Sequence, residues 1–355
     1  MKNNIFVKDI SAQILNISTQ RADESTTKDI EQFKLEWFSK KEYIEAFTSG
    51  STGIPSKILL NKKYMMNSAT MTLSYLNIPE NESVLLCMPL KFIGAKMIMV
   101  RALVGKLNVI AVTPSSHPLK DLIETPYFAA MTPAQVASSL EDEKQAATLQ
   151  KINTLIIGGG PVNLDLFEKI KNFKNNIYST YGMTETMSHI ALKKLTNGFE
   201  NEYHPFSGVA LTKDENDCLV ISCKKLGISS LKTKDIVKFN SDGSFLIQGR
   251  LDNTINTGGI KIQIEAIEEK LSQIIDFDFN ISSIEDPILG EKIVIIANKR
   301  ISCDELIKYK EFLPKYWAPK ESFYTQVIPK TLSGKPARSQ IKNLVMQLKN
   351  EKISK

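Results

Sequence analysis

The sequence predicts an α/β fold: a large N-terminal α/β domain with a parallel sheet and a small β subdomain, followed by a small C-terminal α+β domain. Short β-rich runs alternate with helical patterns up to about residue 250, and short strands between Asp, Asn and Gly turns occupy 203–248. A second alternation of helices and strands begins after Arg250. Such alternation favours a largely parallel sheet covered on both faces. The 355 residues suit about two domains, which we assign to 1–250 and 251–355.

Apolar and β-branched runs form the predicted strands of the N-terminal sheet. They lie at 83–88, 108–112, 127–131, 152–157 and 176–180. The predicted helical segments between them are 91–105, a helical turn over 120–124, a helix from Thr132 with Pro133 at its first position, and a helix capped by Asn163 that ends near Lys171. Proline suits the first helical position and asparagine the N-cap. Because parallel strands point the same way, their carboxyl ends should meet at one edge of the sheet.

The later elements are predicted to be shorter. The β subdomain has expected strands at 219–222, 235–239 and 244–248. The C-terminal domain has an expected helix at 263–273, strands at 279–284 and 292–297, a helix at 304–312, a strand at 323–328 and a last helix from about Ala337. This pattern fits a compact module of roughly 100 residues.

Composition excludes several classes of protein. Charged residues make up 24% and the apolar group 42%, which is typical of a globular chain and not of a disordered one. The net charge of +6 is too small and too spread out to indicate nucleic acid binding. No run reaches about 18 apolar residues, and Lys8 and Asp9 end the N-terminal run Ile5–Val7, so we expect neither a membrane helix nor a signal peptide. The expected location is the cytoplasm.

Cysteine and histidine give little sign of a metal site. The cysteines Cys87, Cys218, Cys223 and Cys303 form no CxxC pair, and we expect reduced, buried thiols. The histidines His117, His189 and His204 have no metal-binding spacing. Arginine is scarce beside lysine, with Arg21, Arg101, Arg250, Arg300 and Arg338 as its members. A position that keeps arginine in such a chain either needs its planar fork or holds it by chance.

The densest polar motif is a Ser/Gly-rich run. It reads Thr48, Ser49, Gly50, Ser51, Thr52, Gly53, Ile54, Pro55, Ser56 and Lys57. Its hydroxyls and backbone N–H groups can surround a polyphosphate, with a lysine nearby for charge. The spacing of a Walker A loop is absent. Taken alone, such a run is most often a flexible turn.

Two more motifs leave the carboxyl ends of neighbouring predicted strands. After 176–180 come Tyr181, Gly182, Thr184 and Glu185, which offer an aromatic face, hydroxyl groups and a carboxylate suited to Mg²⁺. After 152–157 come Gly158, Gly159 and Gly160, where a flat ring could approach the backbone, although a plain turn is the alternative. Open α/β sheets bind ligands at this edge.

Together these motifs resemble the adenylate-forming superfamily of acyl-CoA ligases, luciferases and peptide-synthetase adenylation domains. The resemblance covers about 43–345 and includes four later motifs in the same order. These motifs lie at 231–235, 249–253, 257–261 and 329–338. One such motif would be weak support, whereas the ordered series is specific.

The resemblance implies a role for each matching residue. The 48–57 run would hold the pyrophosphate, and Gly158–Gly160 would approach the nucleotide. Tyr181 would stack on adenine, with Gly182 in the same motif. The implied catalytic residues are Thr184 at the α-phosphate, Glu185 as the Mg²⁺ ligand, and Lys335 at the charge that develops between the attacking carboxylate and the α-phosphate.

The remaining implied roles concern ribose and the second half-reaction. Asp235 would accept hydrogen bonds from the ribose hydroxyls, and Arg250 would pair with ribose or phosphate. Asp252 would be the hinge of a mobile C-terminal domain, whose swing would withdraw Lys335 and bring in Gly258, Gly259 and Lys261 for the CoA step. The sequence departs from the family in three places: Ser56 displaces the loop lysine to Lys57, Lys234 replaces a usual glycine, and only about 47 residues precede the loop, a trimmed N-terminal region.

The chain is most similar to the compact o-succinylbenzoate–CoA ligases of menaquinone synthesis, through 87–103 and 186–190. Arg101 lies on an apolar predicted helix, where it could reach solvent or a surface acid, or bind a second carboxylate of the substrate. Lys96 is the next cationic candidate on that helix. Ser188 and His189 are expected to line the acyl site, although His189 could simply be packed.

The expected reaction is therefore the conversion of o-succinylbenzoate, with ATP and Mg²⁺, to an acyl-adenylate and then to its CoA thioester. The implied partners are small molecules, without nucleic acid or integral membrane association, and a homo-oligomer is left open. Two alternatives stay open: a ligase for another aryl or fatty acid or for a carrier-protein thiol, and a nucleotide-binding protein without turnover.

Overall fold

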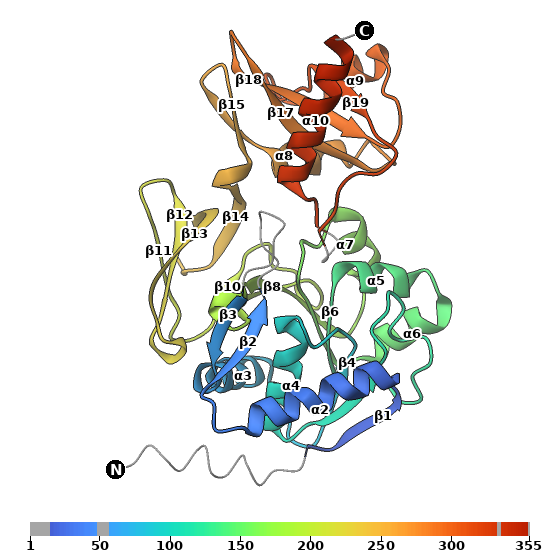
Figure 1. Cartoon of the computed structure of the whole chain (residues 1–355), viewed down its shortest axis with the longest axis vertical. Coiled ribbons are helices and arrows are strands. Elements are labelled where there is room, and N and C mark those ends of the chain that lie inside the picture. The colour runs from blue at the N-terminus through green and yellow to red at the C-terminus, as the bar shows by residue number, and fades with distance from the viewer. Residues whose placement is uncertain (1–14, 48–56, 332–334, 354–355) are drawn as a thin grey trace.

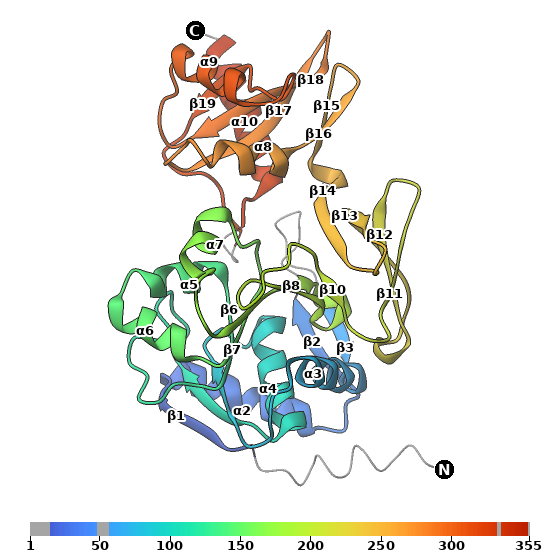
Figure 2. The ribbon, with the colours of Figure 1, turned by 180° about the vertical axis from the view of Figure 1, so that it is seen from behind.

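The computed structural model describes residues 15–47, 57–331 and 335–353. A large sheet with its helices forms the lower part of the molecule in Figure 1, a second sheet lies beside it, and the C-terminal elements lie above. Figure 2 shows the same arrangement from behind. The predicted α/β class, with a parallel sheet and additional β elements, is confirmed.

The large sheet has eight strands in the order β1-β5-β4-β6-β7-β8-β9-β10. In that order the strands are Ile17–Arg21, Asn108–Val112, Ser83–Leu86, Phe128–Met131, Thr154–Ile157, Asn176–Gly182, His189–Lys194 and His204–Pro205. All pairs from β1 to β8 are parallel, whereas β9 and β10 are antiparallel additions at one edge. Every residue of β6 and β7 is buried, as expected for the central strands of a covered parallel sheet.

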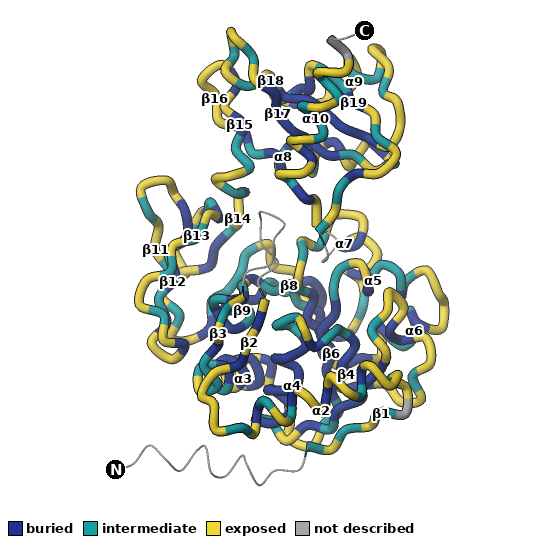
Figure 3. The backbone as a smooth tube through the Cα atoms, in the orientation of Figure 1, coloured by how far each residue is buried: buried dark blue, intermediate teal, exposed yellow. Residues whose placement is uncertain are grey.

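Helices cover both faces of this sheet, and the core is correspondingly divided. On one face lie α2 (Glu24–Phe38), α3 (Lys62–Leu76) and α4 (Ile93–Gly105), and on the other α5 (Pro133–Leu140), α6 (Glu143–Lys151) and α7 (Leu164–Ile170). Successive strand residues point to opposite faces, so Val84 and Leu86 join the first cluster and Leu85 the second. Figure 3 shows the resulting buried interior.

Helix α4 is buried on all sides, because every residue from 95 to 103 is buried. A helix that is apolar on every side belongs in a core. Lys96 and Arg101 are the exceptions to that apolar composition, and both are buried with it. The helix therefore brings two cationic side chains into the interior of the large domain.

Smaller sheets complete the fold. A hairpin pairs β2 (Tyr43–Phe47) with β3 (Lys57–Asn61). The second sheet contains β11 (Ala210–Lys213), β12 (Cys218–Cys223), β13 (Ile228–Phe239) and β14 (Phe245–Arg250). After η3 (Leu251–Asn253) comes a five-stranded sheet of β16 (Ile260–Gln263), β15 (Thr254–Thr257), β18 (Gly290–Ala297), β17 (Phe279–Asp286) and β19 (Glu321–Tyr324). It packs with α8 (Ile264–Leu271), α9 (Cys303–Phe312) and α10 (Arg338–Ile353).

Several predicted elements differ from the observed ones. The helical turn over 120–124 is wrong: the segment forms a turn in which the Lys120 amide donates to the His117 carbonyl, and Pro118 and Pro126 limit any helix there. The strand predicted at 323–328 is β19 at Glu321–Tyr324. The expectation of buried thiols fails for Cys303, which is exposed because it starts α9 directly after its capping residue Ser302.

Within the described ranges, no helix combines the length and the apolar character needed to cross a bilayer.

Candidate active site

The carboxyl end of β8 is held in a tight, defined turn. Its last residue, Gly182, pairs with His189 of β9, and a Cβ at Gly182 would lie 2.3 Å from the Ser188 carbonyl oxygen. Only glycine allows this approach of the two strands. Between them, η1 (Thr184–Thr186) is fixed by the Thr186 hydroxyl, which accepts from the Met183 amide at 2.9 Å. Thr184 is buried in this turn, and Glu185 is half-buried beside it.

The triple glycine leaves β7, the parallel neighbour of β8, so both predicted motifs follow carboxyl ends at the same edge. A Cβ at Gly158 would lie 2.5 Å from the Thr180 hydroxyl oxygen of β8. Gly159 has φ +82°, which side chains rarely adopt. The close contact of the two strands therefore depends on these glycines, and Gly160 continues the turn towards Pro161.

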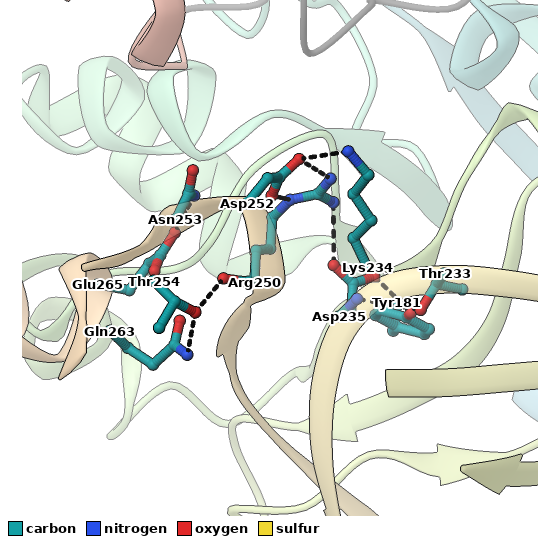
Figure 4. Close-up of polar contacts among 10 residues, drawn as sticks. All are labelled: Tyr181, Thr233, Lys234, Asp235, Arg250, Asp252, Asn253, Thr254, Gln263 and Glu265. Carbon is teal, nitrogen blue, oxygen red and sulfur yellow. Dashed lines mark hydrogen bonds and ion pairs between the residues drawn. The ribbon is translucent and has the colours of Figure 1, made fainter. Parts of the chain in front are cut away.

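Tyr181, Asp235 and Arg250 form one hydrogen-bonded group, drawn in Figure 4. The Tyr181 hydroxyl donates to Asp235 Oδ2 at 2.6 Å, and Arg250 Nη1 donates to Asp235 Oδ1 at 3.0 Å. Burial and the adjacent Asp235 raise the pKa of Tyr181, which keeps its hydroxyl protonated. The group joins β8 to β13 and β14, so residues far apart in the sequence meet near the carboxyl end of β8.

Arg250 extends this group to the predicted hinge residue. Its Nε and Nη2 atoms donate to the two carboxylate oxygens of Asp252 at 3.0 and 3.2 Å, and Lys234 Nζ lies 3.4 Å from Asp252 Oδ2. Partial burial raises the pKa of Asp252, but the bonds and charges of Arg250 and Lys234 outweigh it and lower that pKa overall. Lys234 therefore acts as a second cation at Asp252 in this structure.

Aromatic rings surround Tyr181. Its ring centroid lies 5.9 Å from that of Tyr203 and 5.3 Å from that of Phe245. The Tyr203 hydroxyl and the Ser179 hydroxyl are 3.0 Å apart. Sequence reasoning missed Tyr203 and Phe245, since neither belongs to a recognised motif.

Lys335 lies near the same group of charges. The residue is exposed, but nearby protein atoms remove part of the hydration of its amine, and this desolvation lowers its pKa. The positive charge of Arg250 lowers the pKa further, while Asp235 raises it. The structure thus brings Lys335 into the electrostatic range of Asp235 and Arg250.

Arg101 is buried without an acidic partner among the described residues. The residue is 1% exposed, and its Nη2 donates to the Ser188 hydroxyl at 2.7 Å. Its Nε atom has no hydrogen-bond partner within the described part of the chain. Burial lowers its pKa to about 9. A buried guanidinium of this kind is costly unless an anion or further acceptors meet it.

The other substrate-binding candidates divide into two places. His189 is buried next to Arg101 and Ser188: its Nδ1 lies 3.2 Å from the Ser188 hydroxyl, and its Nε2 lies 3.1 Å from the Thr72 hydroxyl. Lys96 instead faces α2, with its Nζ 3.8 Å from Glu36 Oε2. Thr72 was missed because no helix was predicted before residue 83.

The remaining predicted site residues belong to the Ser/Gly-rich run and to the motif at 257–261. Residues 48–56 lie outside the described residues, whereas Lys57 starts β3 and its Nζ lies 2.6 Å from Glu45 Oε1. Gly258 and Gly259, with φ +59° and +80°, form the exposed turn between β15 and β16, next to the exposed Lys261. Figures 1 and 2 both place that hairpin among the C-terminal elements, away from β8.

Glu185 is the available carboxylate for a metal ion at the β8 turn. No hydrogen bond or ion pair from another described residue occupies it, and the described chain holds no group of three His, Cys, Asp or Glu side chains suited to a metal. A Mg²⁺ ion commonly takes only one or two protein carboxylates and completes its shell with phosphate and water. The donor set therefore fits a magnesium ion carried by a nucleotide.

The fold and this site define a class. Residues 11–220 match the family of AMP-binding enzymes, and the chain belongs to that family, within the adenylate-forming superfamily. Among its curated relatives is the 2-succinylbenzoate–CoA ligase of Bacillus subtilis (strain 168), 24% identical over 367 residues, which span 92% of this chain and 74% of the relative. The 2-succinylbenzoate–CoA ligase of Geobacillus sp. is 25% identical over 342 residues, spanning 86% and 69% of the two chains.

Solved structures share the fold. An AMP-forming acyl-CoA synthetase/AMP-acid ligase II-like protein from Dyadobacter fermentans is 27% identical, with a TM-score of 0.62 and coverage of 93% of this chain and 96% of that one. The o-succinylbenzoate coenzyme A synthetase of Bacillus subtilis, solved with ATP and magnesium ion, is 21% identical, with a TM-score of 0.70 and coverage of 84% and 69%.

Proposed function

We propose that this AMP-forming acid–CoA ligase acts on o-succinylbenzoate, as a step of menaquinone biosynthesis. The observation that carries this choice is the buried Arg101 guanidinium, which no described carboxylate meets. o-Succinylbenzoate has two carboxylates, one activated and one on the ring. The ring carboxylate would supply the anion that Arg101 lacks, through a bidentate contact. The names of the curated relatives support the same acid.

In the first half-reaction, an oxygen of the succinyl carboxylate attacks the α-phosphorus of ATP. The bond from that phosphorus to the bridging oxygen breaks, and pyrophosphate leaves. We assign Lys335 to the charge between the attacking carboxylate and the α-phosphate, with Thr184 as a donor to the same phosphate. The 48–57 run and Gly158–Gly160 would surround the nucleotide.

Ribose and adenine would be held by the Tyr181 group. We assign Asp235 to the ribose hydroxyls and Arg250 to ribose or phosphate. These two residues are bonded to each other, and Asp235 is bonded to Tyr181 near the carboxyl end of β8. Tyr181 would contribute its ring to adenine. A magnesium ion on Glu185 would neutralise phosphate charge.

In the second half-reaction, the CoA sulfur attacks the acyl carbon, the bond to AMP breaks, and the thiol proton passes to solvent. We propose that residues 251–355 turn about Asp252 between the halves. This rotation would withdraw Lys335 and bring the hairpin turn of Gly258, Gly259 and Lys261 to the carboxyl end of β8. The present separation of that turn from β8 suits the first half-reaction.

Mass spectrometry of products tests the assignment. Enzyme, ATP, Mg²⁺ and CoA are incubated with o-succinylbenzoate or with benzoylpropionate, which has the ring and the acyl chain but no ring carboxylate. We expect AMP and thioester from the diacid, and much slower turnover of the analogue. A rate that is equal for both acids, or no AMP from either, would contradict the diacid assignment.

A further inference from the structure

Arg101, on α4, is one end of a chain of side-chain contacts that runs through Ser188 and His189 to Thr72 on α3. From Arg101 Nη2 the contacts pass to the Ser188 hydroxyl at 2.7 Å, to His189 Nδ1 at 3.2 Å, from His189 Nε2 to the Thr72 hydroxyl at 3.1 Å, and on to the Ser68 carbonyl oxygen at 3.1 Å. Arg101, His189 and Thr72 are each buried. The family motifs account for neither Thr72 nor its partner nitrogen.

The far end of the chain determines its direction. The Ser68 carbonyl oxygen can only accept, so the Thr72 hydroxyl donates its one proton there. The Thr72 oxygen must then accept from His189 Nε2, and that nitrogen carries the ring proton. Since a neutral imidazole has one N–H, His189 Nδ1 is an acceptor.

The same logic continues to Arg101. The Ser188 hydroxyl donates to His189 Nδ1, so its lone pairs face Arg101, which can only donate. Burial, together with the nearby positive Arg101, keeps the pKa of His189 well below its usual value and the ring neutral at pH 7. The Phe206 ring packs edge-on to His189 at 5.4 Å between centroids and limits its rotation.

We infer that Thr72 and His189 are positioning residues that act through Ser188 to hold Arg101 in one orientation for the second carboxylate of the substrate. This role rests on the proposed function. Ser188 holds one of the two terminal nitrogens, and the Nε–H, which has no partner among the described residues, stays available to an anion. A guanidinium without this support would have to be ordered by the substrate itself, at a cost in affinity.

Thr72→Val tests the inference, because valine keeps the shape and removes the hydroxyl. We expect the KM for o-succinylbenzoate to rise about tenfold, the loss of roughly one hydrogen bond, with kcat and the KM for ATP little changed. Thr72→Ser should restore the original KM. The matched control is Thr70→Val on the exposed side of α3, where the hydroxyl donates to the Met66 carbonyl at 3.0 Å in the same way.

The ring tautomer gives a second readout, independent of turnover. With only three histidines in the chain, ¹⁵N-histidine spectra can be assigned through His189→Gln. We expect the Nε2–H form of His189 in the wild type and in Thr72→Ser, and a gain of the Nδ1–H form in Thr72→Val.

Two results would overturn the positioning role while leaving the proposed function intact: an Nδ1–H tautomer in the wild type, or equal KM values for Thr72→Val and Thr70→Val with the diacid preference retained. A wild-type enzyme without preference for the diacid over benzoylpropionate would instead refute the proposed function, and the positioning role with it.

Discussion

The Tyr181 hydroxyl donates a 2.6 Å hydrogen bond to the Asp235 carboxylate, and this contact joins the carboxyl end of β8 to β13 of the second sheet. The two residues are 54 positions apart in the chain. Because Arg250 holds the other oxygen of Asp235, the carboxylate is already oriented before any ligand binds. A preoriented carboxylate of this kind would lose little freedom on accepting ribose hydroxyls, the role we propose for Asp235.

Tyr181→Phe should lower the free energy of unfolding by about 1.5–3 kcal/mol, the usual contribution of a buried hydrogen bond to a charged group. Urea denaturation measures the change. Tyr178→Phe on the same strand is the control, since the described residues give its hydroxyl no hydrogen bond. Equal losses in the two variants would show that the Asp235 contact adds no stability.

Lys335→Ala should slow acyl-adenylate formation by about 10²-fold or more, because the lysine would stabilise charge that develops only in that transition state. Thioester formation from supplied acyl-adenylate should be largely retained. Pyrophosphate exchange and thioester assays measure the two steps. Lys330→Ala, which removes a lysine paired with Asp278 at 3.1 Å in the same segment, should change neither. An equal loss in both steps would argue against the proposed domain rotation.

Gly259→Leu should leave adenylation nearly unchanged and slow thioester formation, since a side chain on this turn would obstruct the approach of CoA. The folded structure leaves open space at Gly259, so any strain comes from its φ of +80°. Gly243→Leu is a matched control, with φ +84° and equally open surroundings in another sheet. Comparable slowing by both substitutions would indicate strain and not a CoA contact.

Arg101→Ala should lower kcat/KM for o-succinylbenzoate. The lost transition-state stabilisation should be about 2–5 kcal/mol, the range for breaking a buried charge pair. Benzoylpropionate should be much less affected, because it has no ring carboxylate to leave unpaired. Steady-state kinetics with both acids measure this difference. Lys96→Ala should leave the preference intact, as Lys96 faces Glu36. Equal losses for the two acids would remove Arg101 from the substrate contact.

Stability should fall as the pH drops through and below about 6.5, because the unfolded chain can protonate His189 whereas the folded chain resists it. In this range the unfolded state binds more protons, so the free energy of unfolding rises with pH. The contribution approaches about 1.4 kcal/mol per pH unit for one such histidine. Denaturation of the wild type and of His189→Gln between pH 5 and pH 7 measures it. Parallel curves for the two proteins would mean that His189 is protonated as easily in the folded state.

Much of the local structure was predictable. Asn163 and Thr132 cap their helices as expected, because capping depends on side chains within three residues. Strand β5 spans the predicted 108–112, since the polar residues on both sides of a short apolar run fix where the strand begins and ends. Helix α2 was not predicted, yet its buried Ile30, Phe33 and Trp37 have helical spacing and Asp23 caps it, so the signal was present.

The sequence by itself determined the α/β class, the order of the motifs, and the placement of two of them after neighbouring parallel strands. These features follow from local composition and from the direction of parallel strands. The division at residue 250 and the roles of the motif residues stay predictions.

Only the tertiary structure decided which charges meet. Lys96 and Arg101 occupy one helix, but one faces Glu36 and the other Ser188, because α4 is covered on every side by different elements. Thr72 comes to His189 from 117 residues away through the packing of α3 on the sheet. Long-range contacts of this kind depend on how whole helices and strands pack, and that information is not present in any local run of residues.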